Sequence, residues 1–338
     1  MLFRRSAPAP PPAPPPRSGP LAFGKIPAKG DFVRLGGASP ALDRFDRWAQ
    51  EALVAAKAQP GPLPDASDTP TVRVAFVPEA GPHVLVGACR LSRDRVGRRY
   101  PFFAGRSVDR RLLEAPLAAR WPVHWAALFD AAAALVDAGV QGRAEPDVLA
   151  SRLQALPPAP TSLRQRTEPL RRYDDALRAR PAAQLWQATW GSPDAGEKPL
   201  LFHRLRTATG AGVRREPPTC GLVFPLPTDA SALEAEHAIA VWAEVAWRTA
   251  GRPPRPPSLW WTEPEPGRAA RLGVFFGDVP PAALAFLQGG PIDDAPGLSV
   301  LDAPGVLRAA DAVLGLPDRL GRLLEAPDLP LGTFLDSL

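Results

Sequence analysis

Proline interrupts this chain often enough to favour short secondary-structure elements. The 338 residues include 45 prolines, and most of them lie between segments with helical or strand periodicity. Proline fixes φ and lacks a backbone N–H, so it ends helices and is excluded from the interior of a sheet. The sequence therefore predicts many short helices and strands joined by stiff loops.

Composition sets the broad class of protein. A hydrophobic content of 45% is enough to fill a globular core, and no run of eighteen apolar residues predicts a transmembrane segment. Residues 1–20 are rich in proline and alanine and lack the apolar centre of a secretory signal, so we expect a disordered arm with polyproline II character. Cys89 and Cys220 lie in apolar runs, which favours buried free thiols in a reducing cytoplasm.

The charge pattern argues against several kinds of partner and cofactor. The net charge is +5, but the basic residues are scattered among 35 acidic ones, and no basic helix or zinc-finger pattern is present. We therefore expect no nucleic-acid partner. The four histidines are far apart in the sequence, without the spacing of metal ligands. We expect neither a metal nor another cofactor.

Periodicity predicts a mixed α/β fold in the first half of the chain. The runs at 71–77 and 83–90 are joined too tightly for a parallel crossover, so they predict an antiparallel hairpin. A third strand is expected at 100–108. Helices are expected at 40–58, 123–138 and 146–156, with Gly139 as the C-terminal stop of the second.

The second half of the chain predicts a further α/β unit. Expected helices are 169–179, 181–190, 231–249, 280–288, 304–314 and 317–325, and expected strands are 199–206, 220–226, 258–262, 271–277 and 298–301. We predict a layered α/β protein with a central, largely antiparallel sheet flanked by helices and a second α/β subdomain. The predicted boundaries are an arm at 1–20, a first domain at 21–156, a linker at 157–168 and a subdomain at 169–338.

Residues 24–33 (GKIPAKGDFV) form the first of two motifs with unusual chemistry. Two of the four lysines in the chain, Lys25 and Lys29, lie within it. The phosphate-loop spacing is absent, because Gly30 is followed by Asp31, whose negative charge opposes phosphate. The segment fits either a charged surface loop that binds a partner or an edge segment that folds back on the sheet.

Residues 94–102 (DRVGRRYPF) form the second motif, at the turn between two expected strands. Asp94 can accept backbone N–H bonds in this turn, and Gly97 can supply a positive φ. Arginines of this turn, such as Arg95 and Arg98, can bind a carboxylate on a neighbouring element or on a partner, or an internal Asp–Arg pair can fix the hairpin. An uncompensated aspartate beside a sheet is costly, so we predict that the two motifs meet, with Asp31 and Asp94 near Lys25, Arg95 or Arg98.

Two further patterns have mainly structural interpretations. Trp260 and Trp261 are adjacent in an expected strand, so their side chains should lie on opposite faces of the sheet, either both covered by helices or with one at a partner. The acidic pairs at 174–175 and 293–294 are interpreted as solvated charges. No nucleophile with a base at recognisable spacing is present.

Three segments resemble one protein family. Residues 24–33 look like the "GKLPSRGDFV" opening of the TagF family, also called ImpM, of type VI secretion-associated proteins. Residues 45–50 (FDRWAQ) resemble its F-x-x-W helix, and residues 94–102 resemble its "DRVGRxFPL" segment. The chain departs from the family at residues 90–93, where a proline-serine step is usual. Residues 258–262 and 280–288 are similar to later parts of longer members.

The resemblance implies a cytoplasmic, non-enzymatic accessory protein that represses assembly of the type VI secretion apparatus after translation, by engaging a forkhead-associated scaffold protein. It does not distinguish a repressor from an activator of secretion. The alternative from the residues themselves is a hydrolase or phosphate-ester enzyme that uses a cleft of lysine, aspartate and arginine. The candidate partner-binding residues are Lys25, Lys29, Asp31, Trp48, Asp94, Arg95 and Arg98.

Overall fold

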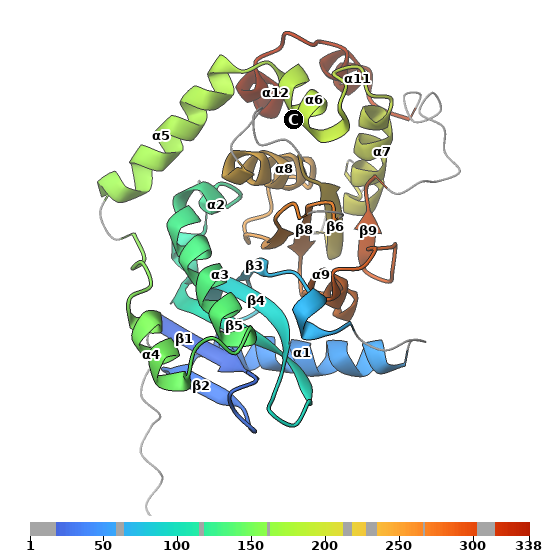
Figure 1. Ribbon diagram of the computed structural model, residues 1–338. Coiled ribbons are helices and arrows are strands. Elements are labelled where there is room, and N and C mark those ends of the chain that lie inside the picture. The colour runs from blue at the N-terminus through green and yellow to red at the C-terminus, as the bar shows by residue number, and fades with distance from the viewer. Residues whose placement is uncertain are drawn as a thin grey trace, which may run out of the picture.

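The computed structural model describes residues 18–58, 64–114, 118–160, 163–211, 218–227, 235–265, 268–302 and 315–338. Most of the predicted arm and the predicted helix at 304–314 lie outside these residues. Within them, one nine-stranded sheet runs through the molecule in the order β2-β1-β5-β4-β3-β7-β8-β6-β9 (Figure 1).

Neighbouring strands of this sheet pair antiparallel, except for the parallel pair of β6 and β9. The predicted mixed α/β fold with a largely antiparallel sheet is therefore confirmed. The strands are β1 (Gly19–Gly24), β2 (Val33–Gly36), β3 (Val72–Phe76), β4 (His83–Arg93), β5 (Arg99–Asp109), β6 (Cys220–Pro225), β7 (Ser258–Thr262), β8 (Arg271–Phe276) and β9 (Leu298–Val300).

Helices cover both faces of the sheet, which explains why its central strands are buried on each side. The α-helices are α1 (Pro40–Lys57), α2 (Trp121–His124), α3 (Ala126–Val140), α4 (Pro146–Gln154), α5 (Leu163–Ala179), α6 (Ala182–Trp190), α7 (Glu197–Thr209), α8 (Ala235–Thr249), α9 (Leu284–Gln288), α11 (Asp318–Leu324) and α12 (Leu331–Ser337). Three short 3₁₀ helices among the described residues are η1 (Ala66–Asp68), η2 (Arg110–Leu112) and η3 (Pro281–Ala283).

The two adjacent tryptophans of β7 belong to different hydrophobic cores. Trp260 is buried beside α1, where its ring meets that of Trp48 edge-on at 4.6 Å between centroids. Trp261 is buried on the opposite face, where it meets Phe129 of α3 at 4.5 Å. The predicted alternation is confirmed, and helices cover both rings.

One expected strand is a helix. Residues 199–206 are predicted as a strand, but they lie within α7. The buried residues of this helix, Leu201, Phe202, Leu205 and Thr209, follow a spacing of four rather than two. This helical period decides the structure, because it places one continuous apolar face against the core.

The chain on both sides of the predicted linker contributes to the same sheet. β3 from the first half pairs antiparallel with β7 from the second half, with Val74 opposite Trp260. Helix α5 begins at Leu163, inside the predicted linker at 157–168. The predicted domain boundaries stay a prediction, but the two halves share a continuous hydrogen-bonded sheet.

Gly139 was expected to end its helix, but it lies inside α3, where it allows close packing. Helix α3 continues through it to Val140, and a Cβ at this position would lie 2.8 Å from Cε1 of the buried Phe102. Such a distance is shorter than van der Waals contact, so glycine allows α3 to approach β5 closely.

We expect Gly139→Leu to lower the free energy of unfolding by about 1–3 kcal/mol, because the added side chain overpacks the contact with Phe102. Urea unfolding followed by circular dichroism measures this loss. The control is Gly321→Ala in α11, where a Cβ would meet no atom within 4 Å and helix propensity predicts a gain of up to about 1 kcal/mol. Equal effects of the two substitutions would contradict the close-packing role of Gly139.

Candidate interaction site

The sheet topology brings the two sequence motifs to the same end of neighbouring strands. The first motif follows β1, and the second begins in the turn between β4 and β5. Because β1 and β5 pair antiparallel, with Phe23 opposite Phe103, the end of β1 lies beside the start of β5. Gly24 makes this approach possible: its φ is +134°, and a Cβ there would lie 2.0 Å from the Pro101 carbonyl oxygen.

A buried ion pair joins the two motifs. The Lys25 ammonium lies 3.0 Å from the Asp94 carboxylate, and the two side chains are 8% and 0% exposed. The predicted meeting of the motifs is confirmed by this contact. The Lys25 ammonium also lies 5.1 Å from the centre of the Phe32 ring, which adds a cation–π contact.

Asp94 organises the turn of the second motif. Its Oδ1 accepts the backbone N–H groups of Val96 at 3.1 Å and Arg98 at 2.9 Å. Gly97 has a φ of +88°, which confirms the positive φ predicted for it. The other carboxylate oxygen, Oδ2, accepts Nε of Arg98 at 2.7 Å. One buried side chain thus fixes both the turn and the neighbouring loop.

Hydrogen bonds between the two loops complete their attachment. The Arg95 backbone N–H donates to the Lys29 carbonyl oxygen at 2.7 Å, and the Arg98 guanidinium donates to the Gly30 carbonyl. Asp31 lies in the exposed part of the first motif, where it accepts the Phe32 backbone N–H at 2.8 Å. Among the described residues, no hydrogen bond or ion pair joins Asp31 to a cation of either motif.

Beside the exposed Asp31 carboxylate, the outer surface of the two loops carries cations and apolar side chains. Lys29, Arg95 and Arg98 are exposed, and the Arg98 side chain keeps 59% of its surface accessible. Phe32 is 44% exposed and Val96 is 69% exposed. We call these five residues the motif surface. Within the described residues, neither Lys29 nor Arg95 makes an ion pair, so their charges face solvent.

The Phe32 ring is held in place despite its exposure. It stacks on Phe23 at 5.4 Å between ring centres and meets Tyr100 edge-on at 4.9 Å. The hydroxyl of Tyr100 in turn donates to the Asp46 carbonyl oxygen at 3.0 Å on α1. The contacts with Phe23 and Tyr100 therefore hold the exposed Phe32 ring in one orientation.

Trp48, the remaining candidate, lies apart from the motif surface. It is 5% exposed within the core between α1 and the sheet, and its Nε1 donates to the Pro280 carbonyl oxygen at 3.2 Å. The structure thus shows a packing role for this residue. Its predicted role in partner binding stays a prediction.

Asp94 is charged in the folded protein over an unusually wide pH range. Burial opposes the charged form, but the hydrogen bonds from the Lys25 ammonium and from the backbone and side chain of Arg98 outweigh it and hold the pKa of Asp94 well below its ordinary value. The folded state therefore binds a proton at Asp94 less readily than the unfolded chain does.

This depressed pKa predicts a pH-dependent contribution to stability. The contribution is fully present above the ordinary carboxyl pKa of about 4 and is lost as the pH falls below it toward the pKa of the folded state. Asp94→Asn should therefore be less stable than the parent chain at pH 7, and the difference should shrink on acidification. Urea unfolding at pH 7 and pH 3 measures both values. A difference that stays constant over this range would contradict the role of Asp94.

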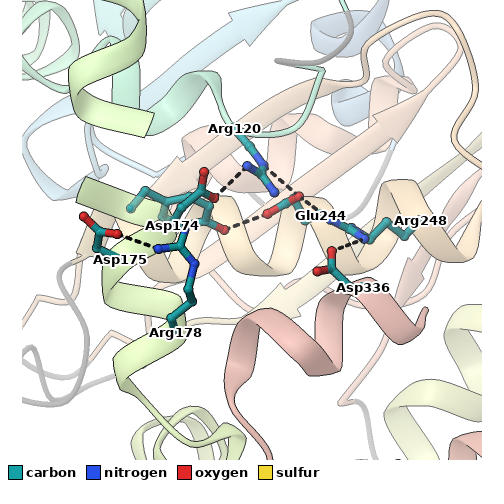
Figure 2. Close-up of polar contacts among 8 residues, drawn as sticks. Arg120, Asp174, Asp175, Arg178, Glu244, Arg248 and Asp336 are labelled. Carbon is teal, nitrogen blue, oxygen red and sulfur yellow. Dashed lines mark hydrogen bonds and ion pairs between the residues drawn. The ribbon is translucent and has the colours of Figure 1, made fainter. Parts of the chain in front are cut away.

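A second polar cluster, which the sequence did not reveal, is buried between helices (Figure 2). At its centre is Glu244 of α8, which is 2% exposed. Its carboxylate lies 2.9 Å from Nε of Arg120 and 3.2 Å from the Arg248 guanidinium, and it accepts the hydroxyl of Tyr173 at 2.9 Å. Burial and the Glu244 carboxylate raise the pKa of Tyr173 well above its ordinary value.

The outer members of this cluster connect four parts of the chain. Arg120, just before α2, also binds Asp174 of α5 at 2.8 Å, and Arg248 binds Asp336 of α12 at 3.1 Å. Asp174 was interpreted from sequence as a solvated charge, whereas its carboxylate is half-buried in this network. Asp175 does face solvent, where it pairs with Arg178 at 2.7 Å. The only sequence signal was an acidic residue, Glu244, within an otherwise apolar helical run.

We expect Glu244→Gln to lower the free energy of unfolding by about 2–4 kcal/mol, because it removes the buried counter-charge that the partly buried Arg120 and the buried Arg248 share, and leaves each paired with a single, more exposed carboxylate. The matched control, Asp175→Asn, breaks an exposed pair and should cost less than about 1 kcal/mol. Chemical unfolding of both variants gives the two values. A loss below 1 kcal/mol for Glu244→Gln would mean that the network does not hold these helices together.

The described residues include neither a cluster of metal ligands nor a membrane-spanning helix. No group of three histidine, cysteine, aspartate or glutamate side chains among them is arranged to hold a metal ion. None of the helices in this part of the chain is both long and apolar enough to cross a membrane.

Comparison with known proteins agrees with the motifs. Residues 22–156 match the family model described as the TagF N-terminal domain, type VI secretion system-associated. Among solved structures, the chain is similar to PA0076 from Pseudomonas aeruginosa PAO1, with 21% identity over 45% of this chain and 76% of that chain and a TM-score of 0.34. No curated protein matches the chain. The resemblance drawn from the three segments, all of which lie within residues 22–156, is confirmed for that part of the chain, which matches the type VI secretion system-associated N-terminal domain of the TagF family.

Proposed function

We propose that this protein is a non-enzymatic, cytoplasmic regulator of the type VI secretion system that represses assembly of the apparatus by binding a forkhead-associated scaffold protein. The observation that carries the proposal is the motif surface. Two segments that are about 60 residues apart in the sequence build one exposed patch, and an internal ion pair holds its shape. A rigid patch of this kind binds a partner with little loss of conformational entropy.

The composition of the motif surface indicates the chemistry of its partner. Lys29 and Arg95 present unpaired positive charge, Arg98 adds a guanidinium that pairs with Asp94 at its Nε, and Phe32 and Val96 present apolar area. Isolated exposed apolar residues are ordinary, but two of the four large exposed hydrophobic residues in the described chain lie on this one surface. The surface complements an acidic face of the scaffold with an apolar pocket at its centre.

The bonding of the motif residues supports a binding role over the hydrolase alternative. The Lys25 ammonium and the Asp94 carboxylate, which a catalytic cleft would need to present to a substrate, are buried against each other. The Asp94 carboxylate also accepts hydrogen bonds from the backbone N–H groups of Val96 and Arg98 and from Nε of Arg98. These contacts support a structural role for both groups beneath a binding surface.

The proposal predicts that Val96→Asp weakens binding to the forkhead-associated scaffold by at least about tenfold, because it places a negative charge on a surface that faces an acidic partner. Val54→Asp is the matched control, since Val54 has the same exposed fraction, 69%, on the separate helix α1. Calorimetric titration of the purified scaffold measures both affinities, and circular dichroism checks that both variants are folded.

Two results would contradict the proposal at different levels. No binding of the parent chain to the scaffold would reject the partner. Binding that Val96→Asp and Val54→Asp weaken equally, or that neither weakens, would retain the partner but reject the motif surface as the site.

A further inference from the structure

A second surface, built from residues outside the two motifs, has the features of a groove for a proline-rich segment. A cavity of about 420 Å³ opens between the start of α3, the chain that follows α4 and the first turns of α5. Its lining is mostly apolar and includes Trp125, Ala127, Leu128, Pro157, Pro158 and Pro169. In Figure 1 the chain between α4 and α5 runs along the side of α2 and α3.

Prolines supply accessible apolar surface in the groove. Trp125 is only 3% exposed, whereas Pro157, Pro158 and Pro169 keep part of their surface accessible. A polyproline II segment suits such a lining, because its rings pack on apolar surfaces and its backbone makes no internal hydrogen bonds.

The chain itself carries such a segment next to the groove. Residues 7–16 (APAPPPAPPP) contain seven prolines and lie among the residues outside the described structure. The described chain begins at β1, where Pro20 lies opposite Arg106 of β5. The Arg106 guanidinium donates to the Leu156 carbonyl oxygen at 3.3 Å, and the next residue, Pro157, lines the groove. The segment therefore leaves the fold one strand away from the groove.

We propose that the proline-rich segment, residues 7–16, binds in this groove of its own chain. At about 3.1 Å per residue, a ten-residue polyproline II segment spans about 30 Å, and residues 17 and 18 connect it to β1. Tethering raises the local concentration of the segment to the millimolar range, so even a weak contact stays largely formed. A proline-rich segment of another protein can occupy the groove only by displacing it.

The test uses the full chain and a full-chain variant in which Pro10, Pro11, Pro12, Pro14, Pro15 and Pro16 are replaced by serine. A fluorescent peptide of residues 4–17 is the probe, and its anisotropy reports binding. The peptide should bind the serine variant at least tenfold more tightly than the parent chain, because the parent segment competes for the groove. The same peptide with its prolines replaced by alanine should bind neither chain.

A groove substitution in the serine variant locates the site. Ala127 is an exposed position of α3, so Ala127→Arg fills the groove without disturbing the core and should abolish peptide binding. Ala55→Arg, at an exposed position of α1, is the matched control and should leave binding unchanged. Three results would overturn the proposal: no binding to the serine variant, equal binding to both chains, or binding that survives Ala127→Arg. Sedimentation that shows a dimer of the parent chain, lost in the serine variant, would overturn it in favour of exchange between two copies.

Discussion

The sheet and both hydrophobic cores depend on the pairing of β3 with β7. It joins strands from the two halves of the chain in one sheet, with Val74 opposite Trp260 and Arg73 opposite Trp261. Because successive residues of a strand face opposite sides, this register directs Trp260 toward α1 and Trp261 toward α3. Each hydrophobic core therefore contains a large aromatic side chain supplied by the other half of the sequence. A shift of one residue would reverse both rings and misfit both cores.

The motif surface depends on the same sheet. Its two loops are adjacent only because β1 and β5 pair antiparallel, and the Lys25–Asp94 ion pair then fixes the loops to each other. Burying both charges is costly, and their mutual contact, with the backbone donors of the turn, offsets that cost. The benefit is a defined geometry rather than net stability. Exposed residues such as Val96 and Arg95 are thereby presented from loops that have little freedom of their own.

Local signals in the sequence predicted the elements whose residues interact with near neighbours. The tight connection before His83 predicted the β3–β4 hairpin, and the glycine-containing turn after Asp94 predicted the β4–β5 hairpin. The meeting of the motifs followed from the cost of an uncompensated aspartate. The predicted strand at 199–206 was wrong because a short segment with several apolar residues fits a strand or a buried helix equally well. Only the spacing of its buried residues distinguishes the two structures.

The cluster around Glu244 could not be predicted, for a different physical reason. Its partners Arg120 and Tyr173 lie 124 and 71 residues away, and nothing in their local sequence distinguishes them from surface residues. Only the packing of α2 against both α5 and α8 brings them together. The groove beside α3 could not be predicted for the same reason, since Trp125 and Pro157 line one cavity only in the folded chain.

The continuous sheet also has a consequence for modularity. The family match covers residues 22–156, yet in this structure that segment ends its share of the sheet at β3, whose five residues are all buried. Expressed by itself, the segment would present a bare apolar strand edge where β7 now lies, and such an edge readily pairs with other chains. In this structure the matched segment therefore shares its sheet with the second half of the chain through the β3–β7 pairing. Any shorter relative with the same sheet must close that edge by other means, with a charged or bulged β3, a covering helix or a second subunit.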